Sequence, residues 1–103
     1  MTTFAELGIN KQLLAAVNRL GFTTPTEIQR LAIPHIIKEK DVIGESATGS
    51  GKTLAFGCSI IEHVQPKKGL QSLVLAPTRE LAEQVKDALR EFASDKDLRI
   101  NAV

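Results

Sequence analysis

The order of apolar and helix-favouring segments predicts an α/β protein with a parallel sheet. After two N-terminal helical segments, strand-like apolar runs alternate with helical ones. The run at 72–76 is apolar without alternation, as expected for a strand covered by helices on both faces. A loop of sequence Gly-Ser-Gly-Lys-Thr, at 49–53, lies between a strand-like run and a helical one. Together these features predict a single P-loop α/β domain.

The first helix is predicted over 11–20, with Asn10 as its N-cap. Gly21 follows and is expected to take the left-handed conformation that ends many helices, with Phe22 packing back on the last turn. The helical spacing itself comes from Leu13, Leu14, Val17 and Leu20.

A second helix is predicted to start immediately afterwards. Thr24 is expected to be its N-cap, with Pro25 at the first helical position and Glu27 completing a capping box. Pro34 is expected to stop or kink this helix, because its ring excludes a continuous hydrogen-bond ladder.

The remaining chain is expected to alternate between strand and helix. Short strands are predicted at 42–44, 72–76 and 98–103, and helices at 54–64 and 79–93. Thr78 can cap the last of these helices. This order gives the strand-helix-strand-helix-strand path of a parallel α/β sheet.

Composition bounds the kind of protein. The chain has 103 residues, 43% of them hydrophobic, which suits one small domain. Its net charge of +1 gives no sign of a nucleic-acid partner, so any such contact must rest on a local patch. Cys58 is the only cysteine, which excludes an internal disulfide and favours a reducing compartment. The N-terminus has no signal-peptide pattern and no apolar run approaches ~20 residues, so we expect a cytoplasmic protein without a membrane partner.

The loop at 49–53 carries the chemistry of phosphate binding. Its glycines let backbone N–H groups converge on phosphate oxygens, and the following helix adds its positive dipole end. Lys52 can reach the β- and γ-phosphates, and the Thr53 hydroxyl can ligate Mg²⁺. Ser46 stands where the strict P-loop pattern has glycine. The plain alternative is a glycine-rich turn with a solvated Lys52.

Hydrolysis would need a further acid, usually an aspartate at the end of an apolar strand. None of the aspartates follows such a run: Asp41, Asp87, Asp95 and Asp97. The residues therefore predict nucleotide binding without an evident means of hydrolysing the nucleotide.

Three segments in order resemble motifs of the DEAD-box ATP-dependent RNA helicases. The Gly-Phe-Thr-Thr-Pro-Thr-Glu-Ile-Gln sequence at 21–29 is similar to the Q motif, and 46–53 is similar to motif I, with Ser46 in place of the family's alanine. Pro-Thr-Arg-Glu-Leu-Ala at 77–82 matches motif Ia. The resemblance covers 1–103 and implies the N-terminal part of a RecA-like domain, a three-layer sandwich built on a parallel sheet.

The resemblance also implies an ATP site. Gln29 would read adenine through its amide, Phe4 would stack on the ring, and the Thr24 carbonyl would accept from the adenine amino group. Phe4 lies 17 residues before Gly21, where the family carries an isolated aromatic. The remaining residues assigned to ATP and Mg²⁺ are Phe22, Ala47, Thr48, Gly49, Ser50, Gly51, Lys52 and Thr53, with Thr53 the Mg²⁺ ligand. Taken singly, Gln29 reads as a solvated amide, Phe22 as a core contact and Phe4 as packed or disordered.

An RNA contact is implied at motif Ia. Pro77, Thr78 and Arg79 would contact the sugar-phosphate backbone, since a helix start and one guanidinium favour phosphate without reading sequence. The plain alternative for Arg79 is a solvent-facing residue in a first helical turn.

The resemblance places the D-E-A-D box, the S-A-T motif and a second RecA-like domain beyond Val103, so we expect the isolated chain to be inactive. Strands from that missing part would separate those present, which predicts exposed strand edges and self-association. The whole protein would couple ATP hydrolysis to RNA duplex unwinding. One alternative is a non-catalytic nucleotide- or RNA-binding module of natural short length. A different P-loop enzyme would leave Gln29 and 77–82 unexplained.

Overall fold

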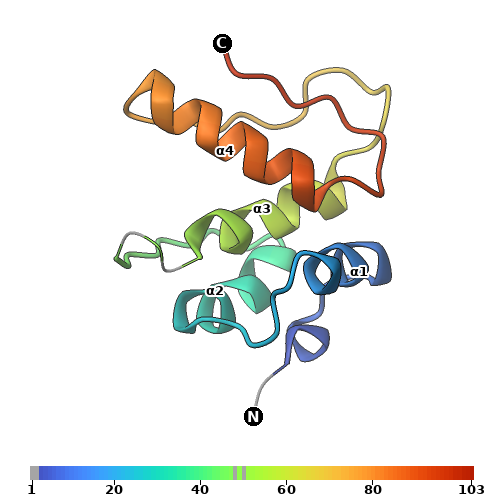
Figure 1. Ribbon diagram of the computed structural model, residues 1–103, viewed down its shortest axis with the longest axis vertical. Coiled ribbons are helices and arrows are strands. Elements are labelled where there is room, and N and C mark those ends of the chain that lie inside the picture. The colour runs from blue at the N-terminus through green and yellow to red at the C-terminus, as the bar shows by residue number, and fades with distance from the viewer. Residues whose placement is uncertain (1–2, 48, 50) are drawn as a thin grey trace.

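The computed structural model describes residues 3–47, 49 and 51–103. A short 3₁₀ helix comes first and four α-helices follow it, packed side by side with extended segments between them (Figure 1). Their bounds are η1 Phe4–Leu7, α1 Lys11–Arg19, α2 Glu27–Ile37, α3 Lys52–His63 and α4 Arg79–Phe92. Across the described residues, no helix is both long enough and apolar enough to cross a bilayer.

Helix α1 begins and ends as its sequence predicts. The Asn10 side chain accepts a hydrogen bond from the backbone N–H of Leu13 at 2.9 Å. At the other end, Gly21 has φ 89° and its N–H bonds to the Asn18 carbonyl, while the N–H of Phe22 bonds to the Val17 carbonyl. This pair of bonds is a Schellman motif, which satisfies the last carbonyls of the helix.

Helix α2 begins two residues later than predicted. Its N-cap is Thr26, not Thr24, and the capping box is closed by Gln29 rather than Glu27. The sequence offers two such boxes two residues apart, and the second one forms because Gln29 also finds a partner outside the helix.

Pro34 does not end α2, which continues to Ile37. The missing N–H leaves only the carbonyl of Arg30 without its helical donor, and Arg30 is exposed, so water can bond to that carbonyl.

The predicted sheet is not formed among the described residues. The segments 42–44, 72–76 and 98–103 carry no strand, and within this part of the chain no backbone hydrogen bond joins one of them to another. In the first two segments the apolar side chains are largely open to solvent, with Ile43 103% and Leu75 85% exposed, whereas Leu98 and Ile100 in the third segment pack against the core. A strand requires a neighbouring strand for its backbone groups, and apolar sequence alone does not supply one.

Extended segments and helices nevertheless alternate along the chain. Helices α2, α3 and α4 all begin on the left of the view, and the extended segments before α3 and α4 both run back to that side (Figure 1). The starts of these three helices therefore lie on the same side of the molecule in this view (Figure 1). Helix α3 begins at Lys52, two residues before its predicted start, and α4 lies within one residue of its prediction. The Thr78 side chain caps α4 by accepting from the N–H of Leu81.

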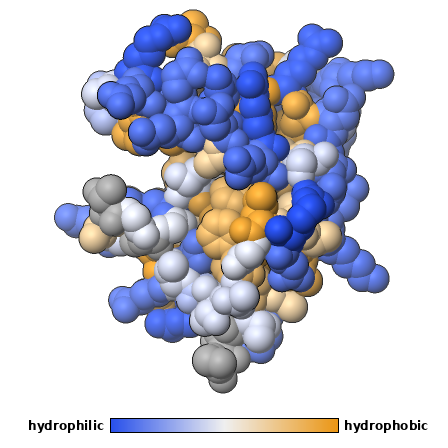
Figure 2. Space-filling view, viewed as in Figure 1, coloured by the Kyte–Doolittle hydropathy of each residue, from blue (hydrophilic) through white to orange (hydrophobic). Residues whose placement is uncertain are grey.

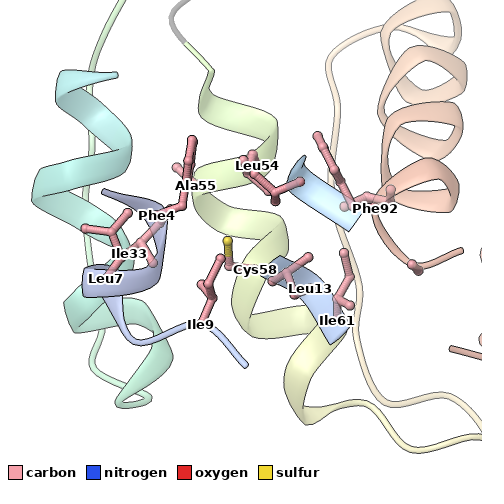
Figure 3. Close-up of a cluster of buried hydrophobic side chains, with 13 residues drawn as sticks. Phe4, Leu7, Ile9, Leu13, Ile33, Leu54, Ala55, Cys58, Ile61 and Phe92 are labelled. Atoms are coloured by element: carbon pink, nitrogen blue, oxygen red, sulfur yellow. The ribbon is translucent and has the colours of Figure 1, made fainter. Parts of the chain in front are cut away.

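Helix α3 lies at the centre of the apolar core and packs against α1, α2 and α4 (Figure 3). Its inward side chains meet residues of the N-terminal segment and of α4. Cys58, on this inward face, is fully buried, and burial raises the pKa of its thiol to about 12. The labelled members of the cluster are Phe4, Leu7, Ile9, Leu13, Ile33, Leu54, Ala55, Cys58, Ile61 and Phe92.

The turn after α4 is tied to two other elements. Arg19, at the end of α1, forms an ion pair with Asp95 at 3.2 Å. Lys96 donates through Nζ to the carbonyls of Ile61 and Glu62, at 2.7 and 3.1 Å, and so satisfies the C-terminal end of α3. The N-terminal helix is therefore held to the same core as the later ones.

A buried amide joins α2 to α3. The Gln29 side chain is 0% exposed; its Oε1 accepts from the N–H of Thr26 at 2.9 Å, and its Nε2 donates to the Gly51 carbonyl at 3.2 Å. Gly51 has φ 89°, and a Cβ there would lie 2.3 Å from that Nε2. This position therefore requires glycine both for its backbone conformation and for the close approach of α2.

We expect Gly51→Ala to destabilise the chain more than an alanine at another positive-φ glycine. The new methyl group would clash with the Gln29 amide, adding to the backbone strain for a total of about 2–4 kcal/mol. The matched control is Gly69→Ala, which has φ 79° and nothing within 4 Å of its added Cβ, so it carries only the backbone cost of about 1 kcal/mol. Urea unfolding of both variants measures the difference. Equal losses of stability would show that the Gln29 contact is not tight.

Candidate nucleotide site

The candidate site lies where α2 and α3 begin. The described part of the loop before α3 comprises 44–47, 49 and 51, and α3 itself contributes Lys52 and Thr53 (Figure 1). Two residues assigned to the site by sequence, Thr48 and Ser50, lie outside the described residues. Ala47 and Gly49 are exposed, and Gly49 has φ 82°.

The start of α3 differs from that of the other α-helices. Its N-cap is Gly51, and among the described residues no side chain caps it, whereas Asn10, Thr26 and Thr78 cap the others. Uncapped N–H groups at the positive end of a helix dipole are suited to an anion. Because Gly51 has no side chain, no side-chain oxygen of the N-cap residue occupies these N–H groups.

Lys52 places its charge at this same helix start. Its Nζ donates to the carbonyl of Ser46 at 2.7 Å, and the side chain is exposed. An ammonium group has three donors, so one bond to the loop leaves others for phosphate oxygens. The lysine therefore both ties the two ends of the loop together and offers positive charge to an anion.

The Thr53 hydroxyl is the candidate Mg²⁺ ligand. Thr53 lies in the first turn of α3 and is half-buried. A hydroxyl beside bound phosphates suits a hard cation that takes oxygen ligands and keeps several waters. Within the described residues, no group of three or more His, Cys, Asp and Glu side chains is gathered as a metal site. The Thr53 hydroxyl therefore fits a cation that arrives together with a phosphate chain.

The residues predicted to surround adenine have different environments. Gln29 is buried against the phosphate loop, as described above, so the plain reading of a solvated amide is wrong. Phe4 is only 3% exposed and meets the ring of Phe22 edge-on, with centroids 6.4 Å apart. Phe22 also contacts Phe92, at 5.6 Å, while Thr24 is exposed on the loop before α2. The role of these rings toward adenine stays a prediction, and both have core contacts.

Sequence reasoning missed a hollow beside this site. It has a volume of about 370 Å³ and lies between the start of α2 and the segment leading to the phosphate loop. Thr26 lines this hollow. The S/T-x-x-E/Q pattern that ends at Gln29 could have identified Thr26 as an N-cap. The residues that line it are Thr26, Glu27, Ile28, Leu31, Glu45 and Ser46.

The residues predicted to contact RNA lie at the exposed start of α4. Pro77, Thr78 and Arg79 are all exposed. The Thr78 hydroxyl oxygen is used as the N-cap, at 3.1 Å from the N–H of Leu81, while its own O–H stays able to donate. Hydrophilic side chains cover the outward side of α4 (Figure 2). The start of α4 lies on the same side of the molecule as the start of α3 (Figure 1).

Comparison with known proteins agrees with this geometry. The chain is 48% identical over 101 residues to the DEAD-box ATP-dependent RNA helicase CshA of Geobacillus kaustophilus (strain HTA426), covering 97% of this chain and 22% of that protein. The crystal structure of a DEAD box protein from the hyperthermophile Methanococcus jannaschii matches with TM-score 0.89 and 36% identity, over 95% of this chain and 27% of that one. Saccharomyces cerevisiae Dbp5 bound to RNA and ADP BeF3 matches with TM-score 0.85 and 33% identity, over 91% and 25% respectively.

The chain thus spans about a quarter of the length of the relatives it matches. The model of the DEAD/DEAH box helicase family matches residues 26–103, which is more than half of the chain. The three motifs, the uncapped start of α3 and these matches lead to one conclusion: this chain belongs to the DEAD/DEAH box helicase family.

Proposed function

We propose that this chain binds ATP with Mg²⁺ and contacts the RNA backbone, as part of the first RecA-like domain of an ATP-dependent RNA helicase. The whole protein would couple ATP hydrolysis to the unwinding of RNA duplexes. The observation that carries this proposal is the Gln29–Gly51 contact, because it brings the Q motif against the phosphate loop at an uncapped helix start. The relatives named above, DEAD-box RNA helicases among them, support it.

The phosphate chain would lie at the start of α3. Backbone N–H groups there and the Lys52 ammonium would bind its oxygens, and the Thr53 hydroxyl would ligate the accompanying Mg²⁺. When bound, Mg²⁺ neutralises part of the negative charge of the phosphates. Adenine would be read by the Gln29 amide, which keeps one donor and one acceptor beyond its two bonds within the protein.

RNA would be held at the start of α4. The helix dipole and the Arg79 guanidinium favour a phosphate, and neither distinguishes one base from another. Since the net charge of the chain is +1, binding would depend on this local contact rather than on a basic surface.

The extended segments 42–44, 72–76 and 98–103 would be strands of the parallel sheet of a three-layer sandwich once further strands lie between them. In the isolated chain, Ile43 and Leu75 of the first two segments are exposed, while Leu98 and Ile100 of the third pack against the core. Exposed apolar segments with unpaired backbone groups are templates for pairing with another chain. Self-association is therefore part of this proposal.

Lys52→Ala is expected to weaken ATP–Mg²⁺ binding at least ~10-fold, a loss of about 1.4 kcal/mol, because it removes the charge beside the phosphates. Lys68→Ala is the matched control, since it removes a lysine from an exposed loop away from α3. Isothermal titration calorimetry measures both. Equal affinity of the wild type and Lys52→Ala would refute the phosphate site.

Purified protein is expected to show no RNA-stimulated ATP hydrolysis. The reason is chemical: no aspartate follows a strand-like run, and the described residues hold no acidic cluster beside Thr53. A phosphate-release assay with and without single-stranded RNA makes the measurement, and Lys52→Ala serves as the background. RNA-dependent turnover above that background would mean that the chain itself carries an acid able to support hydrolysis.

The wild-type chain is expected to form dimers or larger species as its concentration rises. Ile43→Lys should shift it toward monomer, because the side chain is 103% exposed and a charge there opposes edge pairing without disturbing the core. Size-exclusion chromatography with light scattering compares the two, with Glu45→Lys as a charge control on the same segment. A wild-type monomer at high concentration would exclude this association.

A further inference from the structure

We propose that two copies of this chain pair through residues 70–76, as antiparallel strands related by a two-fold axis at Val74. This pairing rests on the self-association proposed above, and it names the segment, the direction and the register of that contact. The partner is a second copy of this chain, and the contact is isologous because both copies use the same segment.

The backbone of 70–76 has no partner strand. Among the residues that the structure describes, none of its N–H or C=O groups is bonded to another backbone group. The turn before it is held by the side-chain amide of Gln71, which bonds to the N–H and the carbonyl of Gln65 at 2.9 and 2.8 Å. The segment therefore leaves a hydrogen-bonded turn and presents a row of donors and acceptors to which another strand can bond.

The side chains of this segment divide between two faces. Leu73 and Leu75 lie on one face of the extended chain and are 77% and 85% exposed. Val74 lies on the other face and is 38% exposed. No charged residue occurs from 69 to 77, so no like charges oppose pairing with an identical segment. An open apolar face beside unpaired backbone groups suits a neighbouring strand that carries the same pattern.

The segment 42–44 is less suited to backbone pairing. It is short, and the charged residues Asp41 and Glu45 lie directly on either side of it. Flanking charges of this kind protect a strand edge from pairing with another chain. Ile43 thus adds exposed apolar surface to the molecule, but it lies on a segment too short for a strand pair.

The segment 98–103 is already tied to the rest of the protein. The carbonyl of Ile100 accepts a hydrogen bond from Nε of Arg90 at 2.8 Å. The side chains of Leu98 and Ile100 pack against the core. Of the three extended segments, 70–76 therefore combines the free backbone with the open apolar face.

Charge favours the antiparallel direction. Lys67 and Lys68 precede the segment, and Arg79 and Glu80 follow it in the first turn of α4. A parallel pair would bring the lysines of one copy beside those of the other. An antiparallel pair instead brings them to the end where the charges of Arg79 and Glu80 offset each other, so the repulsion between like charges is avoided.

The exposed leucines set the register. Residues directly opposite each other in an antiparallel pair project on the same side of the sheet. With Val74 opposite its own twin, Leu73 of each copy lies opposite Leu75 of the other, and the four leucines meet on one face. A shift by one residue would set the open face of one copy beside the less exposed face of the other.

Disulfide crosslinking of cysteine variants tests this register. The two Cα atoms at position 74 would lie ~4.5–5.5 Å apart, so Val74→Cys should form a covalent dimer when diamide is added to oxidise the thiols. Leu70→Cys is the control, because this position is 91% exposed but would lie roughly 27 Å from its twin. The native Cys58 does not compete, since it is fully buried and its pKa is raised to about 12.

A covalent dimer from Val74→Cys and none from Leu70→Cys is the expected result. Equal crosslinking at the two positions would overturn the antiparallel register. A Val74→Cys chain that dimerises by light scattering without forming the disulfide would overturn it as well.

Lysine substitutions separate this strand pair from general apolar contact. Leu75→Lys should shift the chain toward monomer further than Ile43→Lys does, because only Leu75→Lys places a charge within the paired strands. Size-exclusion chromatography with light scattering compares the two at equal concentration. A larger effect of Ile43→Lys would overturn this inference and leave self-association standing. A wild-type chain that stays monomeric would instead refute the self-association itself.

Discussion

The hydrogen bond from Gln29 to the Gly51 carbonyl is the contact on which the candidate site depends. It joins residues 22 positions apart, and the Gln29 side chain that donates it is fully buried. Leaving a buried carbonyl or amide unpaired costs about 1–3 kcal/mol, so the start of α2 is held firmly against the start of α3. Gln29 and the loop before α3 are thus held in fixed positions relative to each other.

Helix α3 connects this site to the rest of the molecule. Its inward face packs against α1, α2 and α4, and its C-terminal carbonyls are satisfied by Lys96. Only its start lacks a side-chain cap among the described residues. The helix is therefore packed along its length and uncapped at its start. This arrangement suits a binding site, because the surrounding structure supports N–H donors that no side chain of the protein occupies.

The extended segments differ from the helices in how little apolar surface they bury. The helices bury their apolar faces together, whereas Ile43 and Leu75 are exposed on segments that carry no strand. Backbone groups of such segments can bond to water, but apolar side chains there gain nothing from folding of the described residues. Residues that read as a buried strand in the sequence therefore form an exposed apolar surface in these two segments.

The sequence by itself determined the local features, because helix ends depend on residues within one turn: Asn10, Gly21 and Thr78 act as predicted. It also identified the motif residues, since glycine, lysine and threonine at that spacing carry phosphate chemistry. Tertiary structure decided what depends on distant partners. The choice of Thr26 over Thr24 as cap, the burial of Phe4 and the absence of strands from the described residues all follow from which segments meet, and neighbours in space are not written in local sequence.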